Sequence, residues 1–63
     1  MTTATKARVL IIEDDESTVL LVEASLLASG AEVFSHGTIS GAMEKIAEVD
    51  PDLVLLDLSL IHI

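Results

Sequence analysis

The stretch RVLIIEDDE, residues 8–16, places four aliphatic side chains directly before four acids. A short aliphatic and β-branched run without polar alternation is typical of a strand that is buried on both faces, as in a parallel sheet. We therefore predict a strand over residues 8–12, with acidic side chains gathered at its carboxyl end.

The residues after this strand predict a helix and then a second, shorter strand. Apolar side chains recur at helical spacings from Ser17 to about Ala28, and Gly30 supplies the glycine expected just after a helix C-terminus. Residues 32–35 are then expected to form a brief strand, with Phe34 in the core.

The next residues predict a second helix and a third strand. Thr38 or Ser40 is expected to cap the helix, whose apolar stripe includes Met43 as a core residue. The helix ends before Pro51, because a proline disfavours a helical conformation at the preceding residue. The run LVLL at 53–56 then predicts a third buried strand.

This alternation of elements predicts an α/β protein with the order β-α-β-α-β. Short connections of this kind imply a parallel sheet with right-handed crossovers. The third strand could lie beyond the second strand, or back beside the first strand, which reverses the winding. The residues alone leave both positions open, and only the second position puts the first strand in the middle.

Composition limits the size and the partners of the protein. With 63 residues the chain is one domain or part of one, and it has no cysteine for a disulfide. Its apolar runs are too short to span a bilayer, and residues 1–6 lack the apolar segment of a secretory signal, so we expect a cytoplasmic protein without membrane contact. The net charge of -8 would repel nucleic-acid phosphates, so direct nucleic acid binding by this segment is not expected.

Acids at the strand ends form the candidate site. Glu13 and Asp14 follow the first strand, and Asp57 follows the third. Ligand sites in open parallel sheets form at these carboxyl ends, and neighbouring strands lie about 4.8 Å apart, so the three carboxylates would meet if the two strands are neighbours. Like charges at such short range resist joint ionisation, and Mg²⁺, which prefers oxygen ligands, would relieve the repulsion.

Simpler explanations apply to some of these residues. Asp15 and Glu16 fit the general preference of acids for a helix N-terminus. Asp57 by itself could be an ordinary aspartate after a strand, but its expected position opposite the other two acids favours a functional role. His36 is interpreted as a solvated turn residue, not as a phosphorelay histidine or a metal ligand.

Four short motifs lie in the first strand and its end, the turn before the second strand, the second helix, and the third strand: VLIIEDDE at 9–16, GAEV at 30–33, AM at 42–43 and PDLVLLDL at 51–58. Together they resemble the receiver domain of two-component response regulators, over roughly residues 7–60. The resemblance implies a flavodoxin-like, doubly wound parallel sheet with the first strand in the middle, here truncated to β-α-β-α-β. Residues 1–7 would be an N-terminal tail and residues 8–63 a partial receiver domain.

The resemblance implies a signalling module and not an enzyme. Asp57 would accept a phosphoryl group from a phosphohistidine on a sensor histidine kinase or phosphotransfer protein, giving an aspartyl phosphate. Asp14 would bind Mg²⁺ directly, Glu13 would hold it through water or through contact with its other ligands, and Asp57 and the backbone carbonyl of Ser59 would be further ligands. Phosphorylation would then reorder nearby loops and act on an output domain or partner.

The chain departs from the receiver pattern near its C-terminus. Ile61 stands where the receiver pattern has a proline, and the composition of residues 60–63 differs from that pattern. We therefore hypothesise that these residues come from read-through into foreign sequence. The receiver residues that contact the phosphoryl group, a Ser or Thr and a Lys, have no counterpart before Ile63. We therefore expect a fragment that holds only the metal-binding half and forms little or no stable phosphoprotein.

Two other functions are weighed against this one. An aspartate-nucleophile phosphohydrolase usually needs a second acid two residues after the nucleophile, where this chain has Ser59. A receiver-like interaction module without phosphorylation is disfavoured by the joint presence of Glu13, Asp14 and Asp57. Mg²⁺ binding that depends on Asp14 would distinguish this module from a phosphoacceptor.

Overall fold

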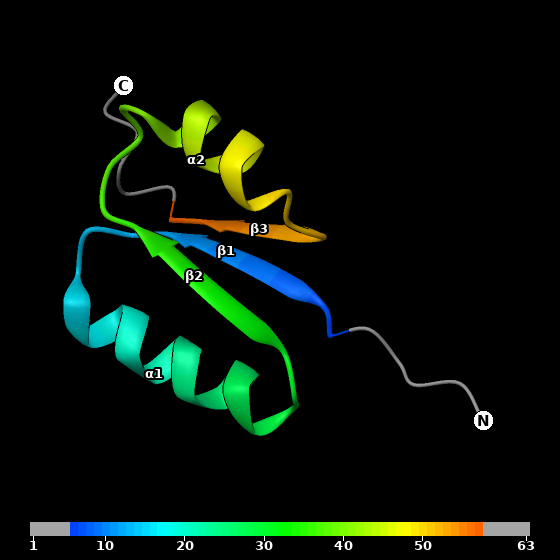
Figure 1. Ribbon diagram of the computed structural model, residues 1–63. Helices are drawn as coiled ribbons and strands as arrows, with labels where there is room; N and C mark the ends of the chain where they lie inside the picture. The colour runs from blue at the N-terminus through cyan, green and yellow to red at the C-terminus, as the bar shows by residue number, and fades with distance from the viewer. Residues whose placement is uncertain (1–5, 58–63) are drawn as a thin grey trace.

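The computed structural model describes residues 6–57, which form an α/β arrangement of alternating strands and helices (Figure 1). The elements are β1 Arg8–Ile12, α1 Glu16–Ala28, β2 Glu32–His36, α2 Ala42–Val49 and β3 Leu53–Leu56. The predicted β-α-β-α-β order is confirmed, and β1 and β3 have the predicted bounds. Helix α1 begins one residue earlier than predicted, and β2 extends one residue further.

The three strands form a parallel sheet in the order β2-β1-β3. Val9 of β1 pairs with Val33 on one side and with Leu53 on the other. Of the two positions that the residues left open for β3, the structure has the one beside β1, so the winding reverses and β1 is central. Figure 1 shows α1 against one face of the sheet and α2 against the other.

The core lies around β1, as its aliphatic composition predicted. Leu10 is fully buried and forms a cluster with Ile12 and Ala42, against which Phe34 and Ile46 pack as partly buried residues. Fully burying one such side chain stabilises a fold by about 1.5–3 kcal/mol. The centre of the sheet is therefore the main source of stability among the described residues.

Strand β3 is not buried, so this prediction was wrong. Exposure reaches 50% at Leu53 and 42% at Leu56. Within residues 6–57, β3 pairs only with β1 and is an edge of the sheet. The run of four aliphatic residues correctly predicted a strand. Its burial, however, depends on how many strands and helices lie beside it, which the run itself does not determine.

The ends of helix α1 follow the expected capping chemistry. Asp15 is the N-cap, and its Oδ1 accepts a hydrogen bond of 3.0 Å from the Ser17 backbone N–H. The Thr18 hydroxyl donates to the other oxygen of the same carboxylate at 2.9 Å. At the C-terminus Gly30 has a positive φ of 93°, which only glycine adopts at little cost, so the predicted stop is confirmed.

Helix α2 begins differently from the prediction. Its N-cap is Gly41, with φ 78° and no side-chain cap, whereas Thr38 and Ser40 do not cap it. The Thr38 hydroxyl donates instead to the Ser40 carbonyl at 2.9 Å, because the loop turns back on itself before the helix begins. Met43, predicted as core, is 76% exposed because α2 packs through Ala42 and Ile46. No helix within residues 6–57 is long and apolar enough to cross a membrane.

Candidate functional site

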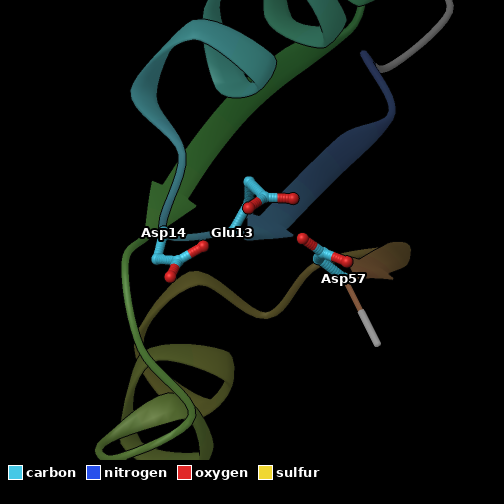
Figure 2. A group of neighbouring side chains, drawn as sticks. All are labelled: Glu13, Asp14 and Asp57. Atoms are coloured by element: carbon cyan, nitrogen blue, oxygen red, sulfur yellow. The ribbon is translucent and has the colours of Figure 1, made fainter. Parts of the chain in front are cut away.

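Three acids from two neighbouring strands gather at one edge of the sheet (Figure 2). Ile12 and Leu56 are register partners at the ends of β1 and β3, so the residues that follow them, Glu13 and Asp57, leave the sheet side by side. Carboxylate oxygens of Glu13, Asp14 and Asp57 all lie within 4.8 Å of one another. The structure thus brings together the three acids that the sequence singled out.

Backbone hydrogen bonds hold this cluster to the sheet. The Glu13 N–H donates to the His36 carbonyl at 3.1 Å, and the Asp57 N–H donates to the Ile12 carbonyl at 3.1 Å. These two bonds continue the sheet ladder beyond the strand ends, on both sides of β1. The main chain that carries Glu13 and Asp57 is therefore positioned by β1, the most buried strand within residues 6–57.

The three carboxyl groups have different surroundings. Glu13 is buried, with 8% of its surface exposed, whereas Asp57 is half-buried and Asp14 is exposed. In Figure 2 Glu13 lies between the other two acids. Glu13 is thus the member of the cluster that is least able to be hydrated.

Neighbouring acids, together with burial, raise the pKa of Glu13. The largest cause is its side-chain hydrogen bond with Asp57, and desolvation and Asp14 act in the same direction. The Asp15 N–H, which donates to Glu13 Oε1 at 3.0 Å, acts against them by favouring the charged form. Two carboxyl groups can share a hydrogen bond only when one of them carries the proton, so the ion-free cluster retains a proton more readily than isolated acids would.

The donor set fits a hard divalent cation. Oxygen ligands about 2.1 Å from Mg²⁺ lie roughly 3–4.2 Å from one another in an octahedron. Here the oxygens all lie within 4.8 Å of one another, so a small side-chain rotation or one intervening water is enough to reach that geometry. A cation at this position would replace the retained proton and offset the repulsion between the carboxylates.

The other residues that the sequence singled out either fall outside the described chain or contribute no carboxylate to the cluster. Ser59, predicted as a backbone ligand, and residues 60–63, suspected to be foreign, fall outside the described residues, as does most of the N-terminal tail. His36 is half-buried at the end of β2, and its ring Nε2 lies 2.8 Å from the Ser40 carbonyl oxygen. The histidine is therefore the last residue of a strand and contacts the loop before α2, so it is not the turn residue that was predicted.

Sequence reasoning missed a hollow beside Asp57. A cavity of about 250 Å³ lies between α1 and β3, and Thr18, Val22 and Leu55 are among its lining residues. Thr18 and Val22 are one helical turn apart and so share a face of α1, which is the signal that could have indicated it. Asp57 and Glu13 also line this cavity, so the acidic cluster opens onto it.

No protein-family model, curated protein or solved structure matches this chain. The case for a function therefore rests on the chemistry of its own residues. Their central feature is a cluster of three carboxyl groups at the carboxyl ends of two adjacent parallel strands.

Proposed function

We propose that this chain is a phosphoacceptor receiver module of two-component signal transduction, with the flavodoxin-like strand order and Asp57 as the acceptor. One observation carries the proposal: carboxylate oxygens of Glu13, Asp14 and Asp57 lie within 4.8 Å of one another at the edge where the winding reverses. Such edges are where open α/β sheets bind ligands. The proposed setting is the cytoplasm, where a sensor histidine kinase presents its phosphohistidine.

The proposed reaction uses Asp57 as an oxygen nucleophile. One carboxylate oxygen attacks phosphorus, the new O–P bond forms as the N–P bond of the phosphohistidine breaks, and the imidazole leaves with a proton. Bound Mg²⁺ supplies neutralisation of charge on the phosphoryl oxygens. Asp14 and Glu13 would hold that cation, and the Asp57 N–H bond to Ile12 orients the nucleophile toward them.

None of the described cations is paired with an acid of the cluster. Lys6 and Arg8 are at the opposite end of β1, and Lys45 pairs with Glu48 at 3.8 Å on α2. A strand rises about 3.3 Å per residue, so the length of β1 separates Arg8 from Asp57. Because no Lys or Arg within residues 6–57 is shown pairing at the cluster, the aspartyl phosphate is expected to form slowly and to be short-lived.

Chemical trapping tests the proposal without requiring a stable product. The chain is incubated with Mg²⁺ and acetyl phosphate, then with hydroxylamine, which converts an aspartyl phosphate to a hydroxamate that peptide mass spectrometry locates. We expect a minor fraction of hydroxamate at Asp57, dependent on Mg²⁺, and no stable phosphorylated population in untrapped samples. Asp57→Asn should abolish the signal.

The matched control for this experiment is Asp50→Asn. Asp50 has a positive φ of 52°, a conformation that asparagine tolerates, and it lies before β3, at the other end from the cluster. Trapping should be unchanged in this variant. Absence of hydroxamate at Asp57, or its appearance mainly at another acid, would overturn the proposal, and a stable phosphoprotein would refute the expected short lifetime.

A further inference from the structure

The four residues of β3 do not by themselves fix the register of this strand against β1. All four are aliphatic, so a shift along β1 would still place aliphatic side chains on both faces of the sheet. A shift of one residue would nevertheless move Asp57 by about 3.3 Å and turn its side chain to the opposite face. The meeting of Asp57 with Glu13 therefore depends on a contact that fixes the register from outside the aliphatic run.

Asp52 makes such a contact with the main chain of Arg8, directly before the two strands begin to pair. The Asp52 N–H donates to the Arg8 carbonyl at 2.8 Å, and the Arg8 N–H donates to Asp52 Oδ2, also at 2.8 Å. The next residue of each strand, Val9 and Leu53, form the first pair of register partners. The two bonds thus close a ring between Asp52 and Arg8 at the start of the β1 and β3 pairing.

The Asp52 carboxylate replaces an acceptor that the main chain does not provide. In a continued parallel ladder the Arg8 N–H would donate to a backbone carbonyl just before β3. The chain bends at Asp52, and Asp50 before it has a left-handed φ of 52°, so this segment is not extended. The side chain of Asp52 therefore accepts the bond from Arg8 in place of a backbone carbonyl.

The Arg8 side of this ring is itself anchored. The Arg8 guanidinium donates from Nη1 to the Val49 carbonyl at 3.0 Å, and its Nε lies 3.4 Å from Glu32 Oε1. Arg8 therefore contacts the end of α2 and the start of β2 as well as Asp52. These contacts give the ring a fixed point on β1 against which β3 is aligned.

We propose that Asp52 is a positioning residue for the acceptor Asp57. Its ring with Arg8 fixes the register of β3 at the start of the strand, which lets the Asp57 N–H reach the Ile12 carbonyl at the far end. Asp57 is thereby set beside Glu13, although Asp52 lies at the opposite end of β3 from the acidic cluster. The role in phosphoryl acceptance rests on the proposed function, whereas the role in strand register does not.

Two substitutions at Asp52 separate its hydrogen bond from its charge. Asp52→Ala removes the acceptor of the Arg8 N–H, whereas Asp52→Asn keeps an acceptor oxygen and loses only the charge. In Asp52→Ala we expect the Asp57 amide to exchange with solvent about three- to tenfold faster, the range that the loss of one hydrogen bond gives, and the hydroxamate yield at Asp57 to fall by a similar factor. In Asp52→Asn both should stay within about twofold of the unmodified chain. Amide exchange is followed by NMR, and hydroxamate by peptide mass spectrometry.

Two controls separate loss of register from a general loss of stability. The Glu13 amide, which donates to His36 on the other side of β1, should change less than about twofold in Asp52→Ala. Glu32→Ala removes a carboxylate from the same end of the sheet but leaves the ring intact, so it should not alter the Asp57 amide. Equal acceleration at Glu13 and Asp57 in Asp52→Ala, or equal effects of Asp52→Ala and Asp52→Asn, would overturn the proposal.

A measurement on the unmodified chain decides the matter if Asp52→Ala does not fold. The Arg8 amide should exchange at least about tenfold more slowly than in an unstructured chain, because the Asp52 carboxylate accepts its bond. An unprotected Arg8 amide would overturn the proposal. Absence of hydroxamate in the unmodified chain would instead refute the proposed function, and the exchange rates would still decide whether Asp52 fixes the register of β3.

Discussion

Strands β1 and β3 are similar in sequence and opposite in environment. Each has four consecutive aliphatic residues followed by an acid of the cluster. In β1 those residues are at most 3% exposed, whereas Leu53 in β3 is 50% exposed. An aliphatic run therefore makes a strand suitable for burial on both faces. Whether the strand is actually buried depends on the strands and helices that pack against it.

The largest expected effect contrasts one leucine from each strand. Leu10→Ala, at a fully buried position, should lower the free energy of unfolding by about 2–5 kcal/mol, through lost burial and a residual cavity. Leu53→Ala should cost less than about 1 kcal/mol, because half of that side chain is already in water. Urea denaturation followed by circular dichroism measures both. Comparable losses for the two variants would mean that β3 is covered in solution.

A loss of 2–5 kcal/mol is large for this chain. At about 0.05–0.15 kcal/mol per residue, a protein of this length has roughly 3–9 kcal/mol of stability in all. Leu10→Ala is therefore expected to leave a substantial unfolded fraction even without urea. Leu53→Ala should remain folded and serves as its matched control.

The second largest effect is expected on Mg²⁺ affinity, when the acids that follow β1 and β3 are substituted. Titration with Mg²⁺, monitored by amide chemical shifts, should move the signals of Glu13, Asp14 and Asp57 first. Asp14→Asn or Asp57→Asn should each weaken Mg²⁺ binding by at least about tenfold, because each removes a charged oxygen ligand. Asp50→Asn removes the same charge away from the cluster and should change affinity little. Equal weakening by all three variants would indicate a diffuse charge effect and not a site.

The smallest effect concerns the pH dependence of the ion-free chain. The folded-state pKa of Glu13 is raised above its ordinary value of 4.5, mainly by the hydrogen bond with Asp57. The folded chain therefore binds this proton more tightly than the unfolded chain does. The resulting contribution to the free energy of unfolding is fully present below pH 4.5 and is lost as the pH rises through the raised pKa. Glu13→Gln should remove that loss, and urea midpoints across this pH window would show it. A slope unchanged by Glu13→Gln would refute this assignment.

Mg²⁺ should reverse the sign of this dependence. Cation binding requires the charged carboxylates, so it competes with the proton on Glu13 and strengthens as pH rises. With saturating Mg²⁺, the stability should increase with pH across the window in which the ion-free chain loses stability. This change of sign separates cation binding from simple relief of repulsion by salt.

Sequence patterns predicted the parts of the fold that depend on local chemistry. The bounds of β1 and β3, the stop at Gly30 and the end of α2 before Pro51 follow from side-chain polarity and backbone preferences, and the structure has all of them. The acidic cluster was also predicted, but only on the condition that β1 and β3 are neighbours. That pairing depends on the whole chain, and the residues alone left it open.

The predictions that failed depend on neighbours in space. Burial of β3 and of Met43 was inferred from apolar character, but neither is covered by another described element. The cap of α2 was assigned to Thr38 or Ser40, whereas a left-handed glycine begins the helix. Gly41 permits a tight approach there: an added Cβ would lie 3.4 Å from the His36 ring, so the geometry depends on a residue from β2.

The Asp57 N–H bond to the Ile12 carbonyl ties the acidic cluster to the last residue of the central strand, directly after the edge formed by β3. A cation held at the cluster would neutralise part of the negative charge at that end of the edge. Such a cation would bind the folded chain, in which the ends of β1 and β3 meet, and not the unfolded chain, in which they are apart. The free energy of unfolding would therefore rise with the concentration of the cation. A ligand held by three side chains would thus also hold the central strand to its neighbour.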